Sequence, residues 1–311
     1  MTERILVVGE ALVDVVHRMD GSIDEHPGGS PLNVAIGLAR LGHPVEFASR
    51  FGPDRHGELI RAHLAAAPHL TLSTGTDQAR RTSTARATLD QRGAASYEFD
   101  LVWDVEPALD ARPVGHLHTG SIAATLAPGA DAVHRRATAT RPSGTISYDP
   151  NARPSLMGTP DQARERIEPM VGLSDVVKAS DEDVRWLYPG VPLEEVLAQW
   201  IGQGVALAVL TLGGDGALAM TSDRRWQRQP ATPATVVDTV GAGDSFMSGL
   251  ISGLLDAGLL GDVAARDRLR GADLVGVAAA LDRAARCAAI TVSRAGANPP
   301  TRAELRDGRP G

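Results

Sequence analysis

A glycine-rich turn leads into a carboxylate near the end of the chain, in the sequence Val-Asp-Thr-Val-Gly-Ala-Gly-Asp of residues 237–244. Gly241 and Gly243 leave backbone amides open to a ligand, and a helix that begins near Asp244 aims its unpaired N–H groups the same way. Together with Ala242, the two glycines predict an anion hole. Asp244 beside an anion suits a general base that takes the proton from a hydroxyl group attacking phosphorus. The alternative is an ordinary glycine turn with an aspartate helix cap.

The residues after Asp244 predict how this helix packs. Apolar residues recur at helical spacing, which is typical of a buried helix. Ser245, Gly249 and Gly253 form a stripe of small residues on one side. We expect this stripe to let the helix lie close to a sheet.

Helix signals follow a second glycine pair in residues 27–42. Ser30 suits an N-cap, Pro31 the first helical position and Gly42 the residue after the helix. These signals predict a helix over 31–41, which starts directly behind the two glycines.

Four residues near this helix start are candidates for binding hydroxyl groups. Gly28 and Gly29 let a ligand approach the backbone, and the amide of Asn33 can both donate and accept hydrogen bonds. Asp14 follows the buried strand 5–8, where open α/β sheets bind ligands. Asp14 is therefore either an acceptor for two sugar hydroxyls or an ordinary exposed carboxylate.

The composition favours one large domain with a small accessory part. It also favours a protein that acts on a small molecule. The chain has 311 residues, 43% of them hydrophobic, and a net charge of −7 with the signs interspersed. This balance argues against nucleic acid or an anionic membrane as a partner, and no segment approaches a membrane span or a signal peptide. We expect a cytoplasmic protein. The single cysteine, Cys287, excludes a disulfide framework and suits a buried structural thiol.

The two glycine motifs resemble the two signatures of the ribokinase-like (PfkB) sugar kinase family, and the similarity runs along nearly the whole chain. This resemblance implies one domain over 1–311, an α/β fold in which a three-layer α/β/α sandwich surrounds a mostly parallel sheet. It also implies a small β lid built from about 12–27 and 82–103. Members of the family transfer the ATP γ-phosphoryl group to a sugar or nucleoside hydroxyl with magnesium. By position, Asp244 resembles the catalytic base of the family. The resemblance places the anion hole at Gly241, Ala242 and Gly243, and the sugar site at Asp14, Gly28, Gly29 and Asn33.

Strands are predicted at 84–89 and 96–101, separated by a turn at 91–93. Tyr97 and Phe99 alternate along the second strand and share one face. That face covers the sugar, covers the core or pairs with another subunit in a homodimer, and we favour the sugar.

Two further segments each end an apolar strand in polar residues, as parallel strands facing a cleft do. His116 and His118 alternate on the first of them, and a metal site is a weak alternative because no third ligand is near in sequence. The second continues into an Asp-Pro-Asn-Ala-Arg sequence that resembles an element of fructokinases and ketodeoxygluconate kinases. Its Arg153 meets a phosphate or a substrate carboxylate, or forms a surface salt bridge.

The resemblance also implies a nucleotide site, with one departure from the family pattern. Where the family often has Asn-x-x-Glu near magnesium, this chain has Ser180 and Asp183, which keeps a carboxylate for the ion. Two strands around a glycine turn place Thr211, Gly213 and Gly216 beside the nucleotide. A plain hairpin is the alternative reading of those glycines.

A long alanine-rich helix over 271–289 precedes a closing turn over 291–300. In the family this turn lies against the adenine, which makes Gly296 a nucleotide-site residue. Backbone carbonyls in it and before the anion hole can hold a potassium ion; the candidates are Asp238, Val240, Thr291, Arg294 and Gly296.

These observations predict an ATP-dependent sugar kinase, with the fructokinase branch favoured by residues 10–14 and 97–99. The alternatives are a 2-keto-3-deoxygluconate kinase or another sugar kinase of the family. Outside enzymes, a sugar sensor or a nucleotide-binding regulatory subunit on the same fold remains open. The intact Asp244 argues against both.

Overall fold

The computed structural model describes residues 4–17, 22–89 and 95–307, with the backbone alone for 87–89 and 95–97. Its largest element is a nine-stranded sheet in the order β13-β12-β11-β10-β9-β8-β1-β4-β5. The strands of this large sheet are β1 (Ile5–Val8), β4 (Val45–Ala48), β5 (Leu70–Leu72), β8 (His116–Gly120), β9 (Thr145–Asp149), β10 (Val176–Ser180), β11 (Leu207–Thr211), β12 (Ala217–Thr221) and β13 (Trp226–Gln229).

The seven strands from β11 to β5 are parallel to one another, whereas β12 pairs antiparallel with β11 and the edge strand β13 pairs antiparallel with β12. The central strands are buried along their whole length, as expected where helices cover both faces of a sheet. Their carboxyl ends therefore meet at one edge, which we call the carboxyl edge; the opposite edge is the amino edge.

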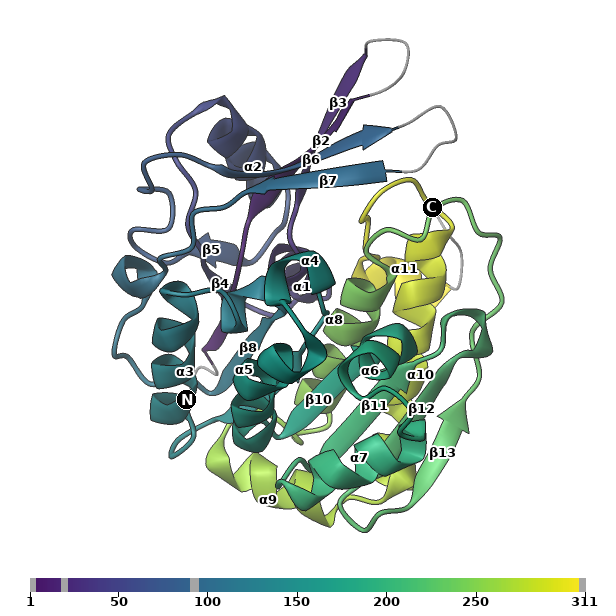
Figure 1. The fold of residues 1–311 in the computed structure, drawn as a ribbon. Helices are drawn as coiled ribbons and strands as arrows, with labels where there is room; N and C mark the ends of the chain where they lie inside the picture. Colours follow the sequence, from purple (N-terminus) through teal and green to yellow (C-terminus); the bar gives the residue numbers. More distant parts are fainter. Residues whose placement is uncertain (1–3, 18–21, 90–94, 308–311) are drawn as a thin grey trace.

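Helices form the two outer layers of the sandwich (Figure 1). One face is covered by α1 (Ser30–Arg40), α2 (Arg55–Ala65), α8 (Ala242–Asp256), α9 (Val263–Gly271) and α10 (Leu274–Val292). The other is covered by α3 (Gly129–Thr140), α5 (Pro160–Leu173), α6 (Asp181–Leu187) and α7 (Leu193–Gly202). Short helices complete the described chain: α4 (Pro154–Met157), α11 (Arg302–Asp307) and three 3-10 turns, Glu106–Ala108, Ser121–Ala124 and Gly213–Asp215. The α/β/α sandwich expected from the sequence is confirmed.

A second, four-stranded sheet stands beside the large one at its carboxyl edge (Figure 1). Its order is β3-β2-β6-β7, with strands β2 (Leu12–His17), β3 (Ile23–Gly28), β6 (Ser83–Leu89) and β7 (Ala95–Asp100). The strands predicted at 84–89 and 96–101 are thus present within one residue. Phe99 is half-buried on β7. The turn at 91–93 and the side chain of Tyr97 lie outside the described residues.

Two local predictions about helices were wrong, and the bounds of a third helix differ from those predicted. Gly29, not Ser30, is the N-cap of α1, and the Ser30 side chain makes no capping bond. The long helix predicted over 271–289 is α10, which begins three residues later at Leu274 because Asp273 caps it by accepting a hydrogen bond from the Gly276 amide, and which ends at Val292. The small residues of α8 pack against α10 rather than a sheet: a Cβ on Gly253 would lie 2.5 Å from the Ala280 Cα.

Other local expectations hold. Gly42 follows α1 with a φ of 86°, as predicted for the residue after this helix. Cys287 is buried. In the described part of the chain, no helix combines the length and the apolar character needed to cross a membrane.

Candidate active site

The predicted anion hole lies at the first turn of α8. Gly241 is the N-cap with φ 73°, and a Cβ there would come within 2.5 Å of the Ala297 Cβ, so only glycine fits. Ala242 and Gly243 are the first two helical residues. The Ala242 amide donates to the Thr239 carbonyl at 3.2 Å, and the Gly243 amide precedes the first helical hydrogen bond, which runs from the Ser245 amide to the Gly241 carbonyl at 2.8 Å. Asp244 is the third helical residue rather than the cap, so capping does not explain its presence.

Both carboxylate oxygens of Asp244 are held by residues of α1. The Ser30 hydroxyl donates to Oδ1 at 2.6 Å, and the Asn33 amide donates to Oδ2 at 2.8 Å. Asp244 is only 8% exposed. A carboxylate oxygen has more than one lone pair, so each oxygen keeps acceptor capacity for a substrate hydroxyl. The two sequence motifs therefore meet at a single carboxylate.

The other predicted sugar-site residues lie next to this pair of helices. The Asp14 carboxylate sits against Gly28, because a Cβ on Gly28 would be 2.4 Å from Oδ2. Gly29 has φ 120° and lies over the Glu10 carbonyl. Burial raises the pKa of Asp14, while attraction to Arg153 and His26 opposes the rise. Asp14 is thus a partly desolvated carboxylate rather than an ordinary exposed one.

Sequence reasoning left Glu10 out of the site. It follows β1 at the carboxyl edge and is 5% exposed, and its Oε2 is buried without a hydrogen-bond partner among the described residues. Burial raises its pKa to about 7, against the opposing effects of Arg153 and Ser121. Ser121 itself has a positive φ of 53°, a strained conformation of the kind that clusters at functional sites. The signal was available, since Glu10 stands directly after a buried strand.

Arg153 turns back on its own segment. Its Nη1 donates to the Asn151 carbonyl at 3.0 Å and to the Asn151 side chain at 2.8 Å, and Asn151 has a φ of 36°. The guanidinium lies near enough to attract both Glu10 and Asp14. It therefore faces the same space as the sugar-site carboxylates.

A buried ion pair not foreseen from the sequence lies below the anion hole. Lys178 Nζ is 2.7 Å from Asp149 Oδ2, and the two side chains are 5% and 0% exposed. Burial raises the pKa of Asp149 to about 6, while Lys178 opposes the rise. The pKa of Lys178 is raised because attraction to Asp149, Asp244 and Asp183 outweighs its burial. Lys178 therefore stays charged.

The sequence predicted that the two strand histidines face a cleft, but in the structure they do not. His116 and His118 are fully buried, and they hydrogen-bond to the hydroxyls of Thr145 and Ser147 on β9. Burial lowers the pKa of each histidine to about 3. They form a neutral polar layer beneath the site.

Ser180 and Asp183 form a capping box at the start of α6. Ser180 Oγ accepts from the Asp183 amide, and the Asp183 carboxylate accepts from the backbone amides of Ser180 at 3.0 Å and Ala152 at 2.8 Å. Within the described residues, no three His, Cys, Asp or Glu side chains gather as a metal site. Magnesium keeps several waters and uses one or two carboxylates plus substrate phosphates, so it does not require such a cluster.

The predicted nucleotide residues follow β11. Thr211 ends that strand, and Gly213 faces open space, since an added Cβ would meet nothing within 4 Å. Gly216 differs, because a Cβ there would come within 2.1 Å of the Gln229 carbonyl of β13. Its glycine is thus required by the strand packing, whatever binds nearby.

The structure brings the predicted potassium segments together. The Val237 amide donates to the Val292 carbonyl at 2.7 Å, and the Gly296 amide donates to the Asp238 side chain at 2.8 Å. The Thr291 and Gly296 carbonyls already accept backbone hydrogen bonds. Both segments adjoin the anion hole through Ala297, which packs on Gly241.

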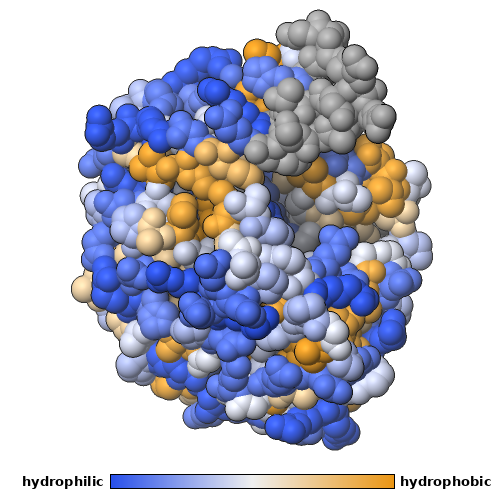
Figure 2. Space-filling model, viewed as in Figure 1, coloured by the Kyte–Doolittle hydropathy of each residue, from blue (hydrophilic) through white to orange (hydrophobic). Residues whose placement is uncertain are grey.

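The surface is recessed near the centre of the space-filling view, between the small sheet and the helices below it (Figure 2). In the same view of the ribbon, α8 lies behind this recess.

Comparison with known proteins identifies the family. Residues 2–304 match the pfkB family carbohydrate kinase description. The chain belongs to the pfkB family of carbohydrate kinases. It is 30% identical over 305 residues to an Escherichia coli fructokinase, an alignment covering 96% of this chain and 95% of that one.

Solved structures of pfkB kinases share the fold. A Vibrio cholerae O395 fructokinase double mutant in fructose-, ADP- and potassium-bound form has a TM-score of 0.78 and 28% identity, with 98% of each chain covered. An ATP-bound Xylella fastidiosa fructokinase has a TM-score of 0.84 and 26% identity, covering 99% of this chain and 98% of that one. As a pfkB kinase, the protein is a phosphotransferase with a sugar hydroxyl as acceptor.

Proposed function

We propose that this pfkB kinase is an ATP-dependent fructokinase, converting D-fructose to fructose 6-phosphate in the cytoplasm. The observation that carries the proposal is Asp244, held at both oxygens by α1 and placed in the first turn of α8. Relatives named as fructokinases support the choice of sugar.

Asp244 takes the proton of the attacking hydroxyl. The hydroxyl oxygen forms a bond to the γ-phosphorus, and the bond from that phosphorus to the bridging oxygen breaks to leave ADP. The amides of Gly241, Ala242 and Gly243 stabilise the charge on the phosphoryl oxygens.

The sugar would be held by the residues around the two helix starts. Asp14 and Asn33 bind hydroxyls, Gly28 and Gly29 allow close approach, and Arg153 faces the same space. Tyr97 and Phe99 of the small sheet would cover the sugar as a lid over this domain. Ile23 of the same sheet is 55% exposed, an apolar side chain suited to contact with a second subunit in a homodimer.

The nucleotide would bind along the carboxyl edge beyond the anion hole. Ser180, Thr211, Gly213, Gly216, Gly241, Gly243 and Gly296 are the proposed contacts. Magnesium, with Asp183 nearby, would neutralise phosphate charge. Potassium would be held by the carbonyls of Asp238, Val240, Thr291, Arg294 and Gly296.

An ADP-release assay over a panel of sugars tests the proposal. Fructose should show a kcat/KM at least about tenfold above ribose and 2-keto-3-deoxygluconate, a difference of about 1.4 kcal/mol. A preference for the keto acid would overturn the choice of sugar and make Arg153 the carboxylate partner. Sugar binding without ADP release from any sugar would instead support a sensor.

A further inference from the structure

The basic residues of this chain are distributed in an unusual way. Of its 31 Lys and Arg residues, Lys178 is the only lysine. Many of the described arginines form ion pairs at the surface, whereas Lys178 stands in the middle of β10 and its side chain is buried beside the first turn of α8. The one position that does not use arginine is therefore inside the candidate active site.

Packing explains why arginine does not fit there. The Lys178 ammonium touches the Asp149 carboxylate on one side at 2.7 Å. On another side it lies against the first turn of α8, since a Cβ on Gly243 would be only 3.2 Å from Nζ. A compact point charge fits this space, and a planar guanidinium does not. Gly243 is thus small where the lysine approaches.

The charge of Lys178 is directed at the anion hole. An ammonium group has three donors, and Asp149 accounts for one direction. The pKa of Lys178 is raised by Asp149, Asp244 and Asp183, so the group is a fixed cation beside the helix amides. A preorganised cation where negative charge develops is an effective way to stabilise a transition state.

We propose that Lys178 is a catalytic residue whose ammonium contacts the transferred phosphoryl group in front of Gly243, and that Asp149 positions it. The proposal rests on the proposed kinase function. As the hydroxyl oxygen bonds to phosphorus and ADP leaves, Asp244 receives the proton and Lys178 stays protonated. Lys178 therefore acts by charge alone.

A buried ion pair elsewhere in the same sheet provides the comparison with a structural role. Arg266 Nε lies 2.7 Å from Asp175 Oδ1, with side chains 9% and 0% exposed. This pair is at the amino edge, away from α8. The Arg266–Asp175 pair is about as buried as the Lys178–Asp149 pair, but it lies at the opposite edge of the sheet.

The single lysine makes a direct measurement possible on the wild-type protein. Incorporation of [13Cε]lysine gives one side-chain signal, that of Lys178. A non-hydrolysable ATP analogue with magnesium should shift this signal well beyond the shift that ADP causes, because only the analogue carries a γ-phosphoryl group. The same signal position with both nucleotides would overturn the proposal. This measurement needs no sugar and no turnover, so it stands even if the sugar assignment fails.

Kinetics of matched variants supply the second test. Lys178→Met keeps side-chain length without charge and should lower kcat at least about 10²-fold, with sugar and ATP affinities changed only a few-fold. Asp149→Asn, which keeps the cation but loosens it, should lower kcat about tenfold. Arg266→Met should lower the thermal midpoint while kcat stays near wild type. A kcat loss in Lys178→Met no larger than in Arg266→Met would make the pair structural and overturn the proposal. If Lys178→Met does not fold, the wild-type signal decides.

Discussion

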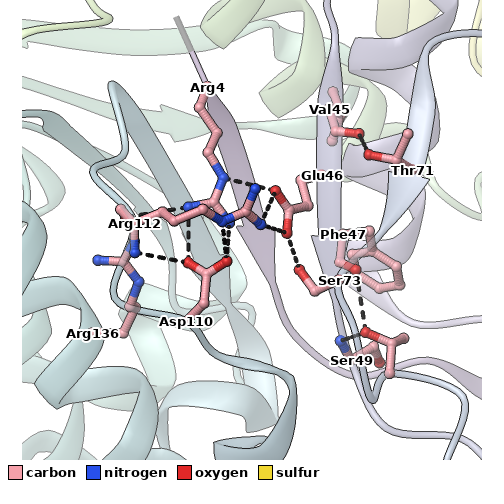
Figure 3. A network of polar contacts seen from close by, with 11 residues as sticks. Arg4, Val45, Glu46, Phe47, Ser49, Thr71, Ser73, Asp110, Arg112 and Arg136 are labelled. Carbon is pink, nitrogen blue, oxygen red and sulfur yellow. Dashed lines mark hydrogen bonds and ion pairs between the residues drawn. The ribbon is translucent and has the colours of Figure 1, made fainter.

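The carboxylates at the two edges of the large sheet differ in how many hydrogen-bond donors they have. At the amino edge, Arg4 donates to Glu46 at 2.7 Å and to Asp110 at 2.9 and 3.0 Å, and Arg112 bridges the same two carboxylates (Figure 3). The side chain of Glu46 also accepts from Ser73. Every carboxylate in this network has several donors.

The same contrast holds for the aspartates at the two ends of β9 and β10. Asp175, at the amino edge, accepts from Arg266 at 2.7 Å, from Arg141 at 3.1 Å and from the Ile146 amide at 2.9 Å. Asp149, at the carboxyl edge, has the Lys178 pair, while its Oδ1 has no hydrogen-bond partner in the described part of the chain. Both side chains are fully buried.

Other polar atoms without a hydrogen-bond partner among the described residues lie at the carboxyl edge, among them Glu10 Oε2, Asn33 Oδ1 and the Tyr148 hydroxyl, whereas Arg136 Nε is such an atom beside the amino-edge network. A buried polar group without a partner costs stability, and native proteins keep few of them. We infer from this difference that the amino edge stabilises the fold, while the carboxyl edge keeps polar groups available to bind substrates.

The largest expected effect at the carboxyl edge is on turnover. Asp244→Asn keeps the side-chain size and one of the two acceptor oxygens, but it removes the proton acceptor. We expect a kcat loss of at least about 10²-fold, equivalent to about 2.7 kcal/mol, with sugar and ATP affinities changed a few-fold. Steady-state kinetics beside calorimetric titration would measure both. Near wild-type turnover would show that another group is the base.

The matched change at the amino edge should act on stability instead. Asp175→Asn leaves the buried Arg266 guanidinium without its carboxylate, so we expect a loss of about 3 kcal/mol in the free energy of unfolding. Urea denaturation would measure it, and kcat should remain within about twofold of wild type. A large kcat loss in Asp175→Asn with unchanged stability would contradict the different roles of the two edges.

The sequence predicts the carboxyl edge better than the amino edge. Asp244, Asn33 and the glycines could be placed because each stands at a helix start or a tight turn, where local geometry restricts residue type. The network of Arg4, Glu46 and Asp110 joins residues far apart in the chain. No local spacing reveals which of many arginines meets which carboxylate.

The errors at the site have the same origin. Ser30 has the signature of a helix cap, yet its hydroxyl donates a hydrogen bond to Asp244, 214 residues away in sequence. His116 and His118 look like ligands that face a cleft, but they are fully buried and hydrogen-bond to hydroxyls of β9. Lys178 was missed because its burial, which gives it its special properties, depends on packing rather than on local sequence.

A smaller effect should appear in the pH dependence of stability. Burial raises the pKa of Glu10 from 4.5 to about 7, so between these values the folded protein binds more protons than the unfolded chain. Stability should therefore fall as pH rises from about 4.5 to 7. Glu10→Gln removes this effect and should gain roughly 1–3 kcal/mol relative to wild type over that range.

Glu46 at the amino edge is the control with the opposite sign. Hydrogen bonds from Arg4 and Ser73 outweigh burial and lower its pKa, so its contribution to stability is lost as pH falls. Glu46→Gln should therefore be most destabilising near neutral pH and least destabilising in acid. Thermal midpoints of both variants from pH 4 to 8 would measure this. Parallel pH profiles for the two variants would contradict the comparison.

The smallest expected effect is that of a monovalent cation. The segments around Asp238 and Gly296 are joined by the hydrogen bond from the Gly296 amide, and the closing turn packs on Gly241 through Ala297. A potassium ion held by carbonyls of both segments would fix Gly241 and hence the amides of the anion hole. We expect activity in potassium chloride to exceed that in sodium or choline chloride several-fold at matched ionic strength. The gain should appear in kcat, because the amides act on the transferring phosphoryl group rather than on the sugar. Equal rates in the three salts would show that the packing of Ala297 alone is enough to hold the anion hole.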